Sequence, residues 1–190
     1  LSIATIAVLI AVTAVFTYII RIPIAPTRGY INFGDVAIFF TAITFGPLTA
    51  LISGGLGTAL ADIIAGYAQW APFSFLAHGL QGLVIALIVG SGAGNTARNL
   101  AHGGYDKKAP GALQRITGGI RLVSLLLAFF AGTLVMGGIY FLVGGFMVGF
   151  PAATAEIPGN ILQNVAGVAV GAPLAVAVRK AYPPIDKFRR

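Results

Sequence analysis

Long uncharged stretches dominate this chain, and each is apolar enough to form a membrane helix. A helix that crosses the ~30 Å hydrocarbon core of a bilayer needs about 20 apolar residues. Charged residues interrupt the apolar pattern at only a few points, and several stretches are too long for a single crossing. The uncharged stretches are 1–20, 36–61, 63–97, 122–155 and 157–178.

Proline and glycine divide the longer stretches. One helix over 35–66 would be roughly 48 Å long, well beyond the hydrocarbon core, and Gly46-Pro47 lies inside it as a natural break. We therefore predict a single domain over 1–190, an all-α membrane bundle with a turn at 149–155 and a loop over 91–119. The six expected helices cover about 1–20, 35–45, 48–66, 72–90, 120–146 and 156–180.

Composition excludes the soluble alternatives. Hydrophobic residues make up 57% of the 190 residues and charged residues only 9%, whereas a soluble domain usually carries about 25% charged residues. So few polar residues cannot coat the surface of a soluble enzyme or of a nucleic-acid-binding domain. The first apolar stretch has neither the charged start nor the cleavage site of a signal peptide, so we expect it to be a helix.

The positive charges predict an orientation in the membrane. Lysine and arginine gather in 91–121 and 179–190, five in each segment, and such clusters mark loops that stay in the cytoplasm. Two predicted helices separate the segments, which therefore share one face, so we expect the 91–119 loop and the C-terminus to be cytoplasmic. Six helices leave only Arg21 and Arg28 outside. Five helices would put all the basic residues inside, and helix length favours six.

Polar side chains on the predicted helices gather toward the outer end. Polar groups inside a membrane are costly, so each is a candidate for function. They follow helical spacing on the fourth and sixth helices, and others flank the second and fourth helices on the same side. This common depth predicts an outward-facing polar cavity. Its candidate substrate-binding residues are Asn32, Asp35, Trp70, Ser74, His78, Gln81, Glu156, Asn160 and Asn164.

Each candidate also has a purely structural interpretation. Asp35 and Glu156 open predicted helices, where a negative charge suits the helix dipole, and Asp62 could brace a helix end. His78 could be a hydrogen-bonded core residue, and the asparagines of the sixth helix could join neighbouring helices. These alternatives stay open at the level of sequence.

Catalytic and metal-binding motifs are absent. The chain has no phosphate-binding loop of the G-x-x-x-x-G-K-[ST] type, so it lacks that route to ATP hydrolysis. Two histidines and no cysteine make a metal centre improbable. We expect neither an enzyme nor a bound cofactor.

Several motifs together resemble a known family. Gly29-Tyr30-Ile31-Asn32-Phe33-Gly34-Asp35 is followed by Phe45-Gly46-Pro47, Gly54-Gly55-Leu56-Gly57, Ala61-Asp62 and Trp70-Ala71-Pro72-Phe73. His78-Gly79-Leu80-Gln81-Gly82 and Glu156-Ile157-Pro158-Gly159-Asn160-Ile161-Leu162-Gln163 come later. In this order they resemble the substrate-binding S component of energy-coupling factor (ECF) transporters, in its riboflavin-transporter-like branch, over essentially the whole chain.

The resemblance implies a function and partners. An S component is a six-helix subunit of a prokaryotic cell-membrane importer, and the loop after its first helix covers an outward-facing pocket for a vitamin. A membrane scaffold, the T component, and two cytoplasmic ATPases complete the importer, and an Ala-x-x-x-Ala face on the first helix docks the scaffold. Ala7 and Ala11 match that face.

One departure leaves the ligand open. Many relatives carry lysine where this chain has His78, and the resemblance implies that this position helps to recognise the substrate. Riboflavin or a related micronutrient is the expected ligand. Pyridoxine, a pyrimidine precursor, pantothenate or an amino acid are the alternatives within transport, and a stand-alone membrane facilitator is the alternative outside this class.

Overall fold

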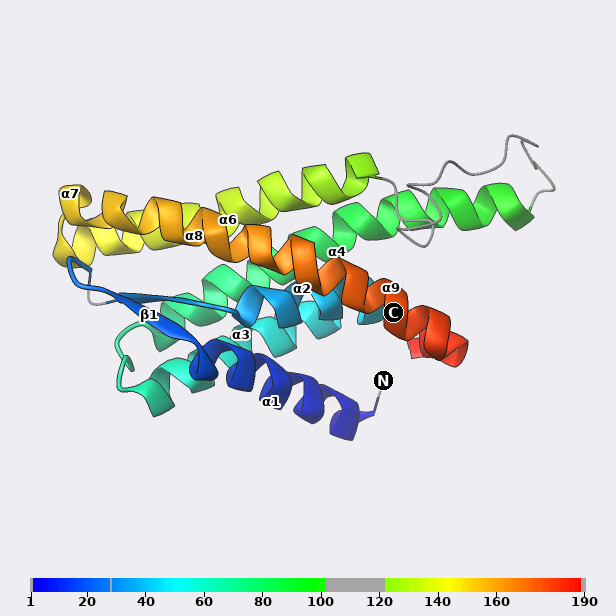
Figure 1. Ribbon diagram of the computed structural model, residues 1–190, viewed down its shortest axis with the longest axis horizontal. Helices are drawn as coiled ribbons and strands as arrows, with labels where there is room; N and C mark the ends of the chain where they lie inside the picture. The colour runs from blue at the N-terminus through cyan, green and yellow to red at the C-terminus, as the bar shows by residue number, and fades with distance from the viewer. Residues whose placement is uncertain (1, 28, 102–121, 189–190) are drawn as a thin grey trace.

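The computed structural model describes residues 2–27, 29–101 and 122–188, and the side chains of 2–27, 29–90 and 122–185 among them. The described residues of the first half of the chain form four helices and one short hairpin, and Figure 1 shows their arrangement. The strands pair antiparallel, with Arg21 opposite Asn32. The elements are α1 (Ile3–Ile19), β1 (Arg21–Ile24), β2 (Gly29–Asn32), α2 (Gly34–Phe45), α3 (Pro47–Ala65) and α4 (Ala71–Ala101).

The second half forms one long helix and then a broken helical run that folds back along it (Figure 1). A π-helical segment interrupts the returning run, where the predicted sixth helix was expected to be continuous. The elements are α6 (Leu122–Val148), α7 (Phe150–Ala153), η1 (Thr154–Glu156), α8 (Ile157–Ala166), η2 (Gly167–Gly171), α9 (Ala172–Ala181) and η3 (Pro183–Phe188).

The helices lie roughly along one axis, and the hairpin, the α3–α4 turn and α7 gather at one end of it (Figure 1). Among the described residues, four helical runs are long and apolar enough to cross a membrane: α3, the Ala71–Gly90 part of α4, α6 and Phe150–Ala181. The apolar helices α1 and α2 are shorter, and α2 would be only roughly 18 Å long at 1.5 Å per residue. The all-α bundle is therefore confirmed, and the count of six membrane spans stays a prediction.

Two predicted boundaries were wrong. The predicted loop over 91–119 is helical in its first part, because α4 continues to Ala101. The glycines there weaken a helix without ending it, and residues 91–109 contain no proline; residues 102–119 lie outside the described residues. The predicted turn at 149–155 contains the short helices α7 and η1, since Pro151 lies in the first turn of α7, where its missing N–H costs nothing.

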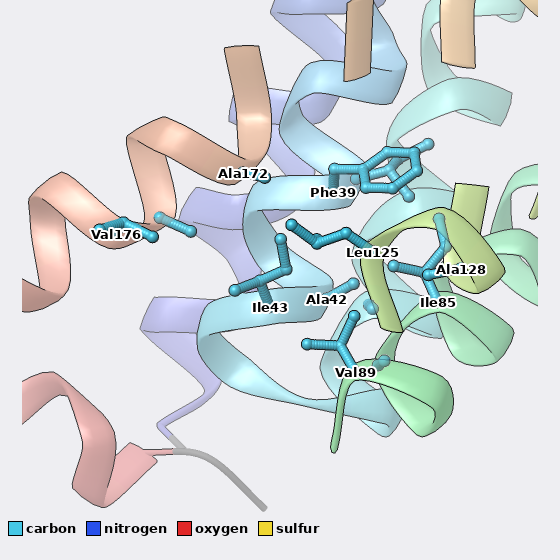
Figure 2. Close-up of a cluster of buried hydrophobic side chains, with 13 residues drawn as sticks. Phe39, Ala42, Ile43, Ile85, Val89, Leu125, Ala128, Ala172 and Val176 are labelled. Carbon is cyan, nitrogen blue, oxygen red and sulfur yellow. The ribbon is translucent and has the colours of Figure 1, made fainter. Parts of the chain in front are cut away.

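The helix α2 forms the centre of the bundle. All of its residues except Phe40 are buried, and its side chains meet α4, α6 and α9 in one apolar cluster (Figure 2). The chain leaves α2 through Gly46, whose φ of 90° suits glycine, and Pro47 then opens α3. This is the break that the sequence predicts.

Glycine lets the returning helical run lie directly on α2. A Cβ atom added at Gly171 would lie 2.5 Å from the carbonyl oxygen of Val36, and one added at Gly167 would lie 3.0 Å from the Cβ of Asp35. Side chains at these positions would force the two backbones apart. The η2 segment can therefore hold its position beside α2 only with glycine at these contacts.

We predict that Gly171→Ala lowers the thermal unfolding temperature of the detergent-purified protein. Overpacking against a fixed backbone atom typically costs about 1–3 kcal/mol. Gly138→Ala is the matched control, because a Cβ atom there would have no other atom within 4 Å. Unfolding followed by tryptophan fluorescence should separate the two variants, and equal melting temperatures would refute the close contact.

Candidate functional site

A cavity lies beneath the β1–β2 hairpin, at the end of the bundle where α3 turns into α4. Its empty space, including the part that opens to the surroundings, is about 440 Å³. The walls come from the hairpin and from α1, α3, α4, α6, η1 and α8. The lining residues are Thr17, Ile24, Gly29, Tyr30, Asn32, Thr58, Asp62, Trp70, Ser74, His78, Tyr140, Glu156, Asn160 and Gln163.

His78 lies at the base of this cavity and contacts an acidic side chain of α2. Its Nδ1 atom is 2.9 Å from the side-chain oxygen of Gln81 and 3.3 Å from Oδ1 of Asp35. Both neighbours can accept a hydrogen bond, so Nδ1 carries the proton. Asp35 is completely buried. The pair therefore fixes the orientation of the imidazole ring from behind.

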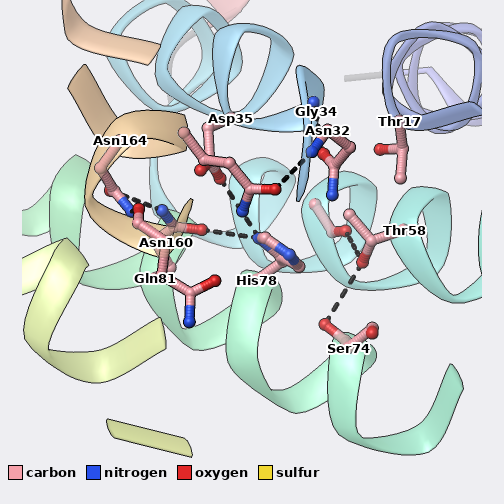
Figure 3. A network of polar contacts seen from close by, with 12 residues as sticks. Thr17, Asn32, Gly34, Asp35, Thr58, Ser74, His78, Gln81, Asn160 and Asn164 are labelled. Atoms are coloured by element: carbon pink, nitrogen blue, oxygen red, sulfur yellow. Dashed lines mark hydrogen bonds and ion pairs between the residues drawn. The ribbon is translucent and has the colours of Figure 1, made fainter. Parts of the chain in front are cut away.

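A chain of amide groups continues from Gln81 into α8. The Gln81 amide donates to Oδ1 of Asn164 at 2.8 Å, and the Asn164 amide donates to the backbone oxygen of Asn160 at 3.1 Å. Figure 3 shows these side chains meeting between α2, α4 and α8. In each of these hydrogen bonds the donor and the acceptor are defined. The orientations of the Gln81 and Asn164 side chains are therefore fixed together with that of His78.

Asp62 of α3 forms another part of the wall, and its two oxygens differ. The Tyr30 hydroxyl donates to Oδ1, whereas Oδ2 is buried without a hydrogen-bond partner among the described residues. Burial and the neighbouring Asp62 carboxylate raise the pKa of Tyr30 far above its ordinary value. The hydroxyl therefore stays protonated and serves as the donor in this contact.

The hairpin is tied to the helices by several contacts at the cavity wall. The backbone N–H of Asn32 donates to the side chain of Gln163, and the Asn32 side chain accepts from the N–H of Gly34 at 2.7 Å. At the other end of the same strand, a Cβ atom at Gly29 would lie 2.5 Å from Oε1 of Glu156. The absence of a side chain at Gly29 thus lets the carboxylate of Glu156 lie against the hairpin backbone.

Aromatic rings complete the walls. Trp70 is buried, and its ring centroid lies 5.9 Å from that of Tyr140; the His78 ring lies 5.6 Å from Tyr140. The hydroxyl of Tyr140 is hydrogen-bonded to Ser74 at 2.6 Å. Such a wall combines flat apolar surfaces with a few fixed polar groups, which is typical of sites for small planar ligands.

The structure brings the sequence-predicted site residues together in two layers. Asn32, Trp70, Ser74, His78, Glu156 and Asn160 line the cavity. Asp35, Gln81 and Asn164 do not line it, and they lie behind His78 in the polar network. Gln81 and Asn164 were selected by helical spacing, and Asp35 by its depth at the start of the second helix. Neither criterion distinguishes a side chain at the cavity from one behind it.

Other lining residues were not predicted as ligand contacts. Asp62 was expected to brace a helix end, and the spacing of the sixth helix left Gln163 outside its polar face. Tyr140 carries the one phenol of α6, and Thr58 is a polar residue in an apolar helix. A rule that treats every polar residue at this depth as a candidate would have found them. The unpredicted polar lining residues are Thr17, Tyr30, Thr58, Asp62, Tyr140 and Gln163.

The proposed docking alanines and metal binding can also be checked against the geometry. Ala7 and Ala11 are exposed on α1, whereas Ala14 is buried. Among the described residues, no group of three or more histidine, cysteine, aspartate or glutamate side chains could hold a metal ion.

Comparison with known proteins gives the family. The model of the family described as "ECF-type riboflavin transporter, S component" matches residues 1–180. An uncharacterised protein of Pyrococcus woesei is 35% identical over 171 residues, which cover 90% of this chain and 97% of that protein. The thiamine precursor transporter HmpT of Lactococcus lactis subsp. cremoris (strain MG1363) is 29% identical over 171 residues, 90% of this chain and 82% of HmpT. This chain therefore belongs to the S components of ECF-type riboflavin transporters, multi-pass membrane subunits that bind the substrate of the importer and are not themselves catalytic.

Proposed function

We propose that this S component binds a small heteroaromatic vitamin or vitamin precursor in the cavity beneath the hairpin. One observation carries the proposal: polar groups from six helical elements and the hairpin converge with aromatic rings on one cavity at one end of the bundle. The opposite half of the core is an apolar cluster around α2 (Figure 2). An apolar core argues against a stand-alone facilitator, which would need a continuous polar path.

The lining residues offer different types of contact to a ligand. His78 offers its second ring nitrogen to the ligand, since Nδ1 is occupied by Asp35 and Gln81. Asn160 and Asn32 supply amide groups, and Trp70 and Tyr140 supply flat apolar surfaces. Asp35, Gln81 and Asn164 act as positioning residues, because they hold His78 and do not line the cavity.

Two classes of ligand are the leading candidates. The family description supports riboflavin, and the relative named as a thiamine precursor transporter supports a smaller heteroaromatic ring. Native mass spectrometry of the gently purified protein tests the proposal directly. A co-purified heteroaromatic compound supports it, and a protein that binds no vitamin-type compound from a broad panel refutes it.

The complete importer requires partners that supply energy. Since the family belongs to ECF transporters, we propose a membrane T component and two cytoplasmic ATPases as partners. The exposed alanines on α1 offer a face that another helix can approach closely, because small side chains bring backbones together. We place the T component at Ala7 and Ala11.

We also propose an orientation in the membrane of a prokaryotic cell. The basic segments 91–121 and 179–190 are assigned to the cytoplasm by their charge. The two chain ends lie away from the hairpin in the bundle (Figure 1). The cavity and its hairpin then face outward, where an imported ligand arrives.

The binding site predicts a loss of affinity in two variants. His78→Ala and Asn160→Ala should each weaken binding of whichever probe the parent binds (riboflavin, thiamine or pyridoxine) by about 1–3 kcal/mol, or about 5- to 150-fold. Quenching of the single tryptophan, Trp70, reports binding. Thr133→Ala is the control, since its hydroxyl bonds to the oxygen of Phe129 in its own helix. Parent-like affinity in both test variants would mean that the cavity is misplaced.

The docking proposal separates binding from transport. Ala7→Leu combined with Ala11→Leu should leave ligand affinity in detergent near the parent value, because these alanines are exposed and outside the cavity. Co-purification with the T component and cellular uptake should both collapse. The matched control carries leucine at Ala169 and Ala177, two exposed alanines of η2 and α9. Parent-rate uptake by a well-expressed double variant would overturn the docking face.

The orientation is tested by labelling cysteines placed in this cysteine-free chain. Gln69→Cys lies at an exposed position of the α3–α4 turn, beside the hairpin end, and Tyr182→Cys lies at an exposed position after α9. A membrane-impermeant maleimide should label the first in intact cells and the second only after permeabilisation. The reverse pattern would show that the cavity faces the cytoplasm.

A further inference from the structure

The acidic groups around the cavity outnumber the positive ones. Asp62 and Glu156 line the cavity, and Asp35 lies directly behind its histidine. The only positive group on these walls is His78, and among the described lining residues none is lysine or arginine. Three carboxyl groups therefore face at most one imidazolium, so acidic groups outnumber basic ones at the cavity among the described residues.

The nearest described arginine does not cancel this excess. Arg21 lies on β1, with its guanidinium 4.2 Å from the ring centroid of Tyr18 and 6.0 Å from that of Tyr30. It stacks on these rings and is not part of the cavity wall.

One carboxylate oxygen of Asp62 accepts no hydrogen bond from the described residues. The residue is only 3% exposed, and its Oδ2 atom is buried without a hydrogen-bond partner among the described residues. An ionised carboxylate in apolar surroundings is costly unless a cation or donor faces it. Tyr30 satisfies only one of the two oxygens. A ligand that donates an N–H to Oδ2 would remove this cost.

The aromatic walls suit the same kind of ligand. The rings of Tyr30, Trp70 and Tyr140 all line the cavity, and the faces of such rings attract cations. Among the described residues no cluster of side chains could hold a metal ion, so an organic cation fits better than an inorganic one. Carboxylate and aromatic groups together favour a planar ring that bears a positive charge or several N–H donors.

We propose that this cavity selects its ligand by charge: it takes a cationic or N–H-donating heteroaromatic amine and rejects rings that carry a carboxylate or a phosphate. Asp62 receives the donor group, Glu156 adds to the negative field, and His78, with its Nδ1 proton held by Asp35 and Gln81, accepts a further N–H of the ligand at its second ring nitrogen. This inference rests on the proposed function, because it concerns the ligand of the same cavity.

The test uses three probes that share a pyridine ring and differ in the charge of one substituent. The probes are 3-(aminomethyl)pyridine, 3-(hydroxymethyl)pyridine and pyridine-3-carboxylate at neutral pH, with binding read from Trp70 fluorescence of the purified protein. We expect the amine to bind about 100-fold more tightly than the carboxylate. At an effective dielectric constant of ~20, a carboxylate a few ångströms away attracts a cation and repels an anion strongly enough for the two binding free energies to differ by at least the equivalent of this ratio. Equal binding of amine and carboxylate, or no binding of the amine, would overturn the proposal.

Variants identify the source of the selectivity. Asp62→Asn combined with Glu156→Gln keeps the side-chain shapes and should reduce the ratio of the amine and carboxylate affinities to within about 10-fold. Asn160→Ala is the control, because it should weaken the amine and the carboxylate alike and leave their ratio unchanged. Thermal unfolding checks that each variant is folded. A ratio that the Asp62/Glu156 double variant leaves unchanged would refute the role of these carboxylates.

A further pair of probes separates this inference from the proposed function. Riboflavin is neutral, and riboflavin 5′-phosphate is an anion on the same ring system. If both bind tightly and the Asp62/Glu156 double variant binds them as the parent does, the cavity is a vitamin site without charge selection. The proposed function then stands, and the charge inference fails. Rejection of the phosphate with retention of the amine supports the inference.

Discussion

The contact between Asp35 and His78 ties together the elements on which the rest of the site depends. It lies inside the bundle, with Asp35 completely buried and its Oδ1 only 3.3 Å from the histidine. Removing one member of a buried pair leaves the other uncompensated and is strongly destabilising. The contact thus requires α2 and α4 to keep their relative positions. The close approach of η2 depends on it too, because Gly167 lies directly against Asp35.

The burial of α2 also explains why polar groups collect at only one end. The helix has 12 residues and is apolar beyond Asp35, apart from Thr41 and Thr44, so its later turns fill the core with Phe39, Ala42 and Ile43 (Figure 2). Its first turn lies level with His78 and Asn164 (Figure 3). The cavity therefore forms above the start of α2, and the hairpin that precedes this helix becomes its cover.

The sequence predicted the helices and the depth of the site well, because both depend on local signals. Uncharged runs and the Gly46-Pro47 break placed α2 and α3, and helical spacing grouped Ser74 with His78. The hairpin was missed because its strands are four residues long and one contains a proline. The division between cavity wall and supporting layer was missed because it depends on how α2, α4 and α8 pack. Spacing along a single helix cannot report that packing.

The groups that hold the hairpin are the groups that line the cavity, so cover and binding site are not independent. Tyr30 reaches Asp62, and the backbone of Asn32 reaches Gln163. A ligand that had to break these bonds would lose as much as it gained, because each bond removed leaves a buried group unsatisfied. Asp62 avoids this conflict, since Tyr30 uses Oδ1 and leaves Oδ2 without a partner among the described residues. In the proposed complex, an N–H donor binds there while the hairpin stays attached, and the same carboxylate serves closure and recognition together.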